Sequence, residues 1–166
     1  MPSLAAKQRS PGNRLLRIRS SVTYVPHVKL SVKSDYAARA VIGLAKHYPT
    51  GAALKVEDLA AESSTPANYL VQILIELKSR HIVKSIRGKE GGYLLARPPA
   101  EISLGDVLRC VHGRVFDPPA LHDAHCPAEL RAAWKKLQTA LDETADGITF
   151  QKLLDEGADK AKMYYI

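Results

Sequence analysis

Two amide side chains and a run of basic side chains between residues 68 and 89 have the chemistry needed to bind duplex DNA. Asn68 and Gln72 lie four residues apart, so they would share one face of a helix. Each amide can donate one hydrogen bond to adenine and accept another. Tyr69, between them, can direct its hydroxyl toward a phosphate. Basic residues that could track phosphates follow without an intervening acidic residue: Lys78, Arg80, Lys84, Arg87 and Lys89.

The basic run ends in a glycine-rich segment, R-G-K-E-G-G at residues 87–92. Apolar, β-branched segments at 82–86 and 93–95 flank it and predict a β-hairpin. Glycines such as Gly88 allow a tight turn and a close approach of the backbone to DNA. A narrow tip carrying Arg87 and Lys89 suits the minor groove of A·T-rich sequence.

Three helices must position these side chains. The apolar spacing predicts helices over 34–46, 56–62 and 67–79, with a turn at 63–66 between the last two. Ser34 or Asp35 is the expected cap of the first helix, and Pro66 fits the first position of the third. The core stripe of the third helix is predicted to be Leu70, Ile73, Leu74 and Leu77. Followed by the hairpin, this order predicts a winged helix-turn-helix domain over residues 29–100.

The C-terminal part could pack its apolar face on the chain's own core, but it is predicted to pair two copies of the chain. A helix over 102–111, capped by Ser103, precedes a long helix that Pro127 opens and that reaches about Thr144. Apolar positions in and after that helix recur at alternating spacings of four and three, as in a coiled-coil seam: Leu130, Trp134, Leu137, Leu141, Thr144 and Ile148. A short last helix is expected over 150–154. The fold class is therefore mainly α with a small β-hairpin wing and a long C-terminal dimerisation helix, which together with a tail makes up residues 127–166.

Residues 101–126 are predicted to contain a connecting helix and a sensor loop. Cys110, His122, His125 and Cys126 are the candidate sensor residues, with Asp117 and Asp123 nearby. They could hold a metal or an atypical cluster with mixed ligands. They could instead form an ordinary polar surface loop, or Cys110 and Cys126 could form a redox switch.

Charge is distributed unevenly along the chain. Residues 1–28 have five basic and no acidic residues, residues 29–99 have net charge +5, and residues 100–166 have net charge −3. We interpret residues 1–28 as a disordered basic extension, which either grips phosphate or is a passive tail. A basic N-terminal part suits a polyanion such as DNA. Two cysteines, no long apolar run and no secretory signal lead us to expect a cytoplasmic protein.

Four segments resemble the Rrf-two family of bacterial winged-helix transcriptional regulators, the IscR, NsrR and CymR type. They are K-L-S-V-K-S-D-Y-A-A-R-A at 29–40, L-A-A-E-S-S-T-P-A-N-Y-L at 59–70, R-G-K-E-G-G-Y-L-L at 87–95 and I-S-L-G-D-V-L-R-C-V-H-G at 102–113. The resemblance covers about residues 29–154. It implies a homodimer whose long helices cross and whose recognition helices enter successive major grooves of a near-palindromic site.

The sensor segment departs from this family. Iron–sulfur members carry three closely spaced cysteines before the long helix, whereas this chain has Cys126 alone there, and Cys110 does not match the motif. No cofactor is assigned on this basis, although a cluster or another metal stays open. The signal could be redox state, iron–sulfur status, nitric oxide or cysteine supply, the last through a regulatory protein partner.

The sequence leaves two other classes of function to consider, a protein-interaction module and an enzyme. Val71 and Ile75, on the outer face of the third helix, fit a protein-interaction module that does not bind DNA. An enzyme is not expected, because the chain has no nucleophile elbow, phosphate loop or HExxH pair, and no catalytic residue is assigned. The leading hypothesis is a homodimeric, sequence-specific DNA-binding regulator, a repressor.

Overall fold

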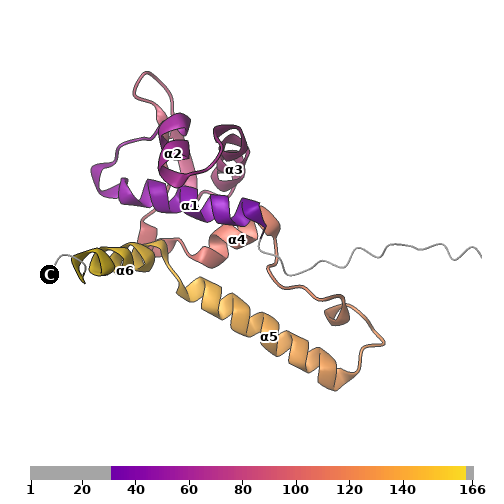
Figure 1. The fold of residues 1–166 in the computed structure, drawn as a ribbon. Helices are drawn as coiled ribbons and strands as arrows, with labels where there is room; N and C mark the ends of the chain where they lie inside the picture. The colour runs from indigo at the N-terminus through magenta and orange to yellow at the C-terminus, as the bar shows by residue number, and fades with distance from the viewer. Residues whose placement is uncertain (1–30, 164–166) are drawn as a thin grey trace, which may run out of the picture.

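The computed structural model describes residues 31–163, so the predicted extension at residues 1–28 lies outside the described residues. The fold is mainly helical with one two-stranded antiparallel hairpin, as predicted (Figure 1). In chain order the elements are α1 (Val32–Lys46), η1 (Tyr48–Thr50), α2 (Val56–Ser63), α3 (Ala67–Ser79), β1 (Val83–Ile86), β2 (Gly92–Leu95), η2 (Pro99–Glu101), α4 (Leu104–His112), η3 (Pro119–Leu121), α5 (Ala128–Gly147) and α6 (Phe150–Met163).

Helix α1 begins earlier than the sequence pattern predicts. Its cap is Ser31, whose extended backbone lets its side chain accept a hydrogen bond from the backbone N–H of Ser34. The predicted caps are therefore wrong. Ser34 is buried inside the helix, and Asp35 pairs with Arg39 one turn later at 2.8 Å.

The turn between α2 and α3 has the expected position. Ser64 adopts a left-handed conformation, with φ of 51°, and ends α2. Pro66 precedes the first helical residue rather than occupying it, and its carbonyl accepts from the N–H groups of Tyr69 and Leu70 at 3.0 Å. The predicted bounds of α3, 67–79, are confirmed.

The hydrophobic core lies around α1. The predicted stripe of α3 is fully buried in it and packs with apolar residues of α1 and α2: Leu70, Ile73, Leu74, Leu77, Ala37, Ala40, Val41, Leu44 and Leu59. Phe150, at the start of α6, is also fully buried in this core. Helix α6 packs against α1 and runs well past the predicted end at residue 154.

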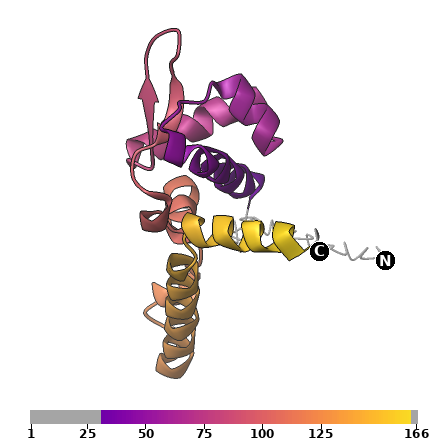
Figure 2. The ribbon, with the colours of Figure 1, turned by 90° about the vertical axis from the view of Figure 1, so that its left-hand side faces the viewer.

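The hairpin pairs Val83 with Leu95 and Ile86 with Gly92. Outside the hairpin, Leu54 bridges to Tyr93 through two backbone hydrogen bonds of 2.8 and 2.9 Å. Gly92 is required here, because a Cβ would overlap the carbonyl oxygen of Leu54. Figure 2 shows the hairpin projecting beyond the helices as a wing.

Helix α4 connects the winged domain to α5. Ser103 and Asp106 form a reciprocal capping box, which confirms Ser103 as the cap. Helix α5 follows Pro127, extends past the predicted end at Thr144 to Gly147, and projects away from the winged domain (Figures 1 and 2). Among the described residues, no helix is long and apolar enough to cross a membrane.

Candidate nucleic-acid interface

The outer face of α3 carries the residues predicted to contact bases. Burial of the core stripe leaves Asn68, Val71, Gln72 and Ile75 exposed. The Asn68 side-chain oxygen accepts from the N–H of Tyr69 at 3.0 Å, so its NH₂ group is left to donate outward. Within the part of the chain that the structure describes, the Gln72 amide makes no hydrogen bond.

Tyr69 is anchored on α1. Its ring packs edge-on against Tyr36, with ring centroids 5.8 Å apart and an interplanar angle of 78°. Its side chain is nevertheless 47% exposed. The contact fixes the orientation of the Tyr69 ring against α1.

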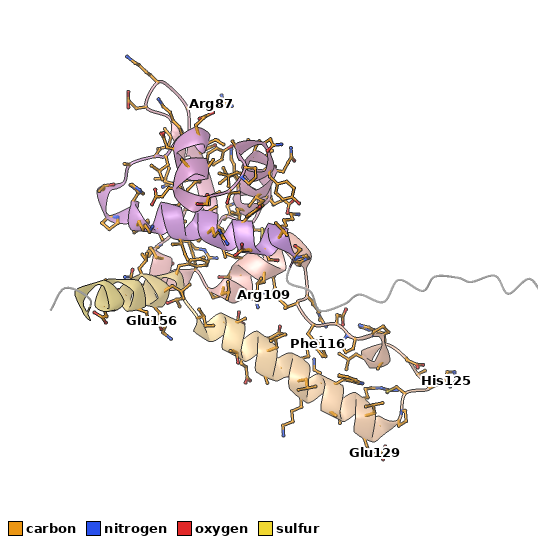
Figure 3. The ribbon with its side chains drawn as sticks, viewed as in Figure 1. Arg87, Arg109, Phe116, His125, Glu129 and Glu156 are labelled. Atoms are coloured by element: carbon orange, nitrogen blue, oxygen red, sulfur yellow. The ribbon has the colours of Figure 1, made fainter. Side chains whose placement is uncertain are left out.

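The wing presents its basic side chains to solvent. Arg87, Gly88 and Lys89 are exposed at the hairpin tip, and Figure 3 places Arg87 near the far end of the wing. Gly88 has φ of 113°, which only glycine adopts without strain. Lys84 is exposed on β1. These residues form no ion pair with any side chain of residues 31–159.

One hydrogen bond joins the wing to the helix. The Lys78 ammonium donates to the Ser85 hydroxyl at 2.6 Å. Because Lys78 lies in the last turn of α3 and Ser85 lies on β1, this bond ties the orientation of the wing to that of α3.

The predicted phosphate-tracking run does not form one surface. Arg80 follows the last turn of α3 and lines a cavity with Arg97 and Cys110, on the side of α4. Local spacing placed Arg80 with the wing, but the turn at His81, with φ of 56°, separates it from β1.

The predicted dimerisation seam of α5 lies on one face of the helix and is only partly exposed. Leu130, Leu137 and Leu141 are 46%, 55% and 37% exposed and lie on one face of the helix. Trp134 turns toward Phe116 of the preceding loop, with ring centroids 5.8 Å apart. Helix α5 therefore carries an apolar stripe without a partner among residues 31–159.

The sensor loop is held by hydrogen bonds from α5 and by an ion pair within the loop. The Arg131 guanidinium donates to the backbone carbonyls of Asp123, Ala124 and Cys126 at 2.7, 3.3 and 3.0 Å. His122 pairs with Asp117 at 2.8 Å. Sequence reasoning missed Arg131, because a helical arginine that binds loop carbonyls has no distinctive spacing.

The two cysteines are both free and lie far apart. Cys110 is next to Arg109, which contacts Asp146 near the C-terminal end of α5, whereas Cys126 precedes its N-terminal end. A helix as long as α5 spans about 30 Å, and a disulfide needs Cα atoms within about 7 Å. Figure 3 places Arg109 and Glu129 near opposite ends of α5. The structure thus contradicts a Cys110–Cys126 bond within one chain in this conformation.

A winged helix-turn-helix with an exposed recognition helix defines the class of winged-helix transcriptional regulators. The family model described as "Rrf2: Iron-dependent Transcriptional regulator" matches residues 30–156, and the chain belongs to this family. The family is one of regulators and not of enzymes.

Relatives agree with this assignment. The chain is 33% identical over 141 residues to CymR, an HTH-type transcriptional regulator of Bacillus subtilis, covering 84% of this chain and 100% of CymR. It is 48% identical over 86 residues to Rv1287 of Mycobacterium tuberculosis, a match that covers 52% of this chain and about half, 53%, of that relative's length.

Solved structures agree as well. The structure of CymR, the global cysteine regulator of B. subtilis, matches with a TM-score of 0.68 and 30% identity over 77% of this chain and 97% of that chain. T. potens IscR matches with a TM-score of 0.66 and 29% identity over 78% and 88% of the two chains.

The family description implies iron, but the candidate ligands do not fit a metal site. Within the described residues, no three His, Cys, Asp or Glu side chains gather in a way that could hold a metal ion. His122 is paired with Asp117, His125 is exposed, and Cys110 lies at the other end of α5 from Cys126. A single chain in this conformation does not present the ligand set that an iron–sulfur cluster needs.

Proposed function

We propose that the protein is a cytoplasmic, sequence-specific DNA-binding transcriptional repressor that acts as a homodimer on a near-palindromic operator. One observation carries this proposal. Gln72 on α3 and Lys84, Arg87 and Lys89 on the wing are exposed and, among residues 31–159, have no side-chain partner. Polar and cationic groups arranged on a helix and an adjacent wing match the grooves and phosphates of duplex DNA.

Each part of this surface has a distinct role in the proposal. Asn68 and Gln72 contact base edges in the major groove, where an amide can pair with adenine in a bidentate manner. Val71, which lies between Asn68 and Gln72 in the sequence, and Ile75, one turn after Gln72, are exposed. They supply apolar contacts to thymine methyl groups. Arg87 and Lys89 enter the minor groove, whose narrow A·T-rich stretches attract cations.

The dimer in this proposal forms through α5. Leu130, Leu137 and Leu141 would be covered by the same stripe of a second copy, as a two-fold symmetric interface requires. Two recognition helices related in this way would contact half-sites about 34–36 Å apart, one turn of DNA. The exposed leucines and the helix length support this arrangement.

A second candidate, a protein-interaction module, draws on Val71 and Ile75, which are 36% and 53% exposed. The salt dependence of binding distinguishes this protein-interaction module from a DNA-binding regulator. Binding to DNA releases counterions, so its affinity falls steeply as the salt concentration rises, whereas an apolar interface shows no such fall. The basic wing beside α3 favours DNA.

The test is selection of bound sequences from a random duplex pool, followed by footprinting and titration at several salt concentrations. We expect one near-palindromic sequence, bound by two copies of the chain. The triple variant Asn68→Ala, Gln72→Ala and Arg87→Ala should lose specific binding, while its thermal unfolding midpoint stays the same as that of the wild type. Operator affinity that survived this variant would show that the surface is misassigned.

The signal is proposed to act through residues 110–126, whose C-terminal part is held against α5 by Arg131. Redox state, iron–sulfur status, nitric oxide and cysteine supply are the candidates. Anaerobic purification with an absorption spectrum and iron analysis distinguishes them. A visible chromophore with bound iron would require ligands that one chain in this conformation does not bring together, and a colourless, iron-free protein would leave redox or protein-partner sensing.

A further inference from the structure

A cavity of about 410 Å³ lies where the end of α3, the end of the wing and α4 meet. Four arginines from these separate elements line it: Arg80, Arg97, Arg109 and Arg114. Asp106 and Cys110 also line this cavity. The volume is within the range of small-molecule sites, about 300–1,000 Å³.

Only part of this positive charge is neutralised. Arg97 lies 3.3 Å from Asp106, and Arg109 lies 3.3 Å from Asp106 and 2.6 Å from Asp146. These ion pairs fix the guanidinium groups of Arg97 and Arg109 in place. Arg80 and Arg114 form no ion pair with any side chain of residues 31–159. The cavity therefore keeps a positive charge and free N–H donors.

Arginine side chains in this arrangement are suited to an oxyanion. A guanidinium presents donors in a rigid fork that matches two oxygens of a phosphate or a carboxylate. Hydrogen bonds and charge from Asp146 and Asp106 raise the pKa of Arg109, so this side chain stays charged at any physiological pH. Two fixed and two unpaired forks around one cavity favour a ligand with more than one anionic group.

We propose that this cavity binds a small multivalent oxyanion, a phosphate ester or a polycarboxylate, as an effector. Arg80 follows the last turn of α3, and Arg114 follows α4 at the start of the loop that leads to α5. A ligand held by both arginines links the recognition helix to the segment that sets the position of α5. In the homodimer of the proposed function, on which this step rests, binding would therefore shift the spacing of the two recognition helices, and DNA would in turn alter the ligand's affinity.

The cavity is separate from the proposed DNA surface. Arg80 is twelve positions along the helix from Asn68, which corresponds to about 18 Å. Figure 3 shows Arg87 and Arg109 on opposite sides of α1. Arg109 is thus not placed to contact the same duplex as the wing tip.

The anion titrations use the full chain without DNA, so they do not depend on the operator proposal. Pyrophosphate and citrate are titrated by calorimetry at constant ionic strength, with chloride as the reference anion. In a Cys126→Ser background, maleimide labelling of Cys110 reports occupancy directly. Arg80→Ala with Arg114→Ala removes the two unpaired forks, and Arg39→Ala is the matched control, since Arg39 is exposed on α1 and pairs with Asp35.

We expect at least one anion to bind and to slow labelling of Cys110. The double variant should bind it roughly a hundredfold more weakly, because two charge-assisted contacts are lost, and Arg39→Ala should bind as the wild type does. Pyrophosphate alone would assign a phosphate ester, and citrate alone a polycarboxylate. The proposal is overturned if neither anion binds above chloride, or if Arg39→Ala weakens binding as much. A separate titration with non-specific duplex, in buffer without pyrophosphate or citrate, gives one more outcome. The proposal is also overturned if the double variant loses affinity for this duplex, which would assign these arginines to DNA.

Discussion

The Arg109 guanidinium lies 2.6 Å from the carboxylate of Asp146 and joins α4 to the C-terminal end of α5. Gly105 makes this contact possible, because a Cβ at that position would overlap the Asp146 carboxylate. The pair lies between the winged domain and the proposed dimerisation helix. Its geometry therefore affects how α5 is oriented relative to α3.

Gly105→Ala should displace the Asp146 side chain rather than unfold the protein, since that side chain is half exposed and free to move. Asp146→Asn should then cost up to about 1 kcal/mol of unfolding free energy in the wild type, as exposed ion pairs do, and close to nothing in the Gly105→Ala background. Chemical denaturation of the wild type, the two single variants and the double variant gives the coupling energy between positions 105 and 146. Gly147→Ala is the control background, because a Cβ there meets no atom. An Asp146→Asn cost that is the same in both glycine variants would contradict the assigned contact.

Asn68→Ala and Gln72→Ala should each reduce operator affinity by about 1–3 kcal/mol, the discrimination that a bidentate amide–adenine pair supplies. Non-specific affinity and the salt slope should stay unchanged, because neither side chain is charged. Titration of operator and scrambled duplexes measures both. Gln151→Ala on α6 provides an amide control. Equal weakening on both duplexes would rule out base contacts by these residues.

Removing the charges at the wing tip should have a different signature. Arg87→Ala with Lys89→Ala should weaken binding to all sequences and reduce the slope of log affinity against log salt by about 2, one per lost contact. Preference for A·T pairs flanking the half-site should also fall. Lys136→Ala on α5 removes a charge outside this surface and should leave the slope intact. A double variant with a normal slope would place the wing away from DNA.

Leu137→Asp with Leu141→Asp should convert the protein to monomers. Each leucine contributes about 1.5–3 kcal/mol when it is buried, and a buried carboxylate adds a further penalty. Sedimentation equilibrium should show the dissociation constant of the dimer raised roughly a thousandfold or more. Thr139→Asp lies on the opposite face of α5 and is the control. Circular dichroism checks that the helices persist, and a double variant that is folded and still dimeric would exclude this stripe as the interface.

Burial, followed by the charge of Glu76, raises the pKa of the Cys110 thiol, while Arg80 and Lys33 act in the opposite direction. The thiol should therefore stay protonated to higher pH than an ordinary cysteine. Its alkylation rate, measured against pH in a Cys126→Ser background, should rise at correspondingly higher pH. Arg80→Ala should move the rise in alkylation rate to higher pH, and Glu76→Gln should move it to lower pH. Coincident profiles for the two variants would contradict the assigned causes.

The same shift links folding stability to alkaline pH. A group whose pKa is raised in the folded state contributes stability that is present below its unfolded pKa and is lost as the pH rises through the folded value. Unfolding free energy should therefore decline through this alkaline range more steeply in the Cys126→Ser protein than when Cys110→Ser is added.

The sequence alone determined the elements and their order. Apolar positions repeating along residues 67–79 gave the correct bounds and buried stripe of α3, because helical periodicity is a local property. The wing and the Ser103 cap were predicted for the same reason: glycines, β-branched residues and capping side chains act on their immediate neighbours. The exposure of Asn68 and Gln72 also followed from their place on the helix.

Only the tertiary structure decided which side chains meet. It separated Arg80 from the wing and placed it with three arginines from other elements, turned Trp134 toward Phe116, and put Cys110 and Cys126 at opposite ends of α5. These contacts join residues distant in sequence, and they depend on how helices pack and loops turn rather than on any local period. The surface proposed to bind DNA was therefore visible in the sequence, whereas the arginine cavity was created by the packing of α3, the wing and α4.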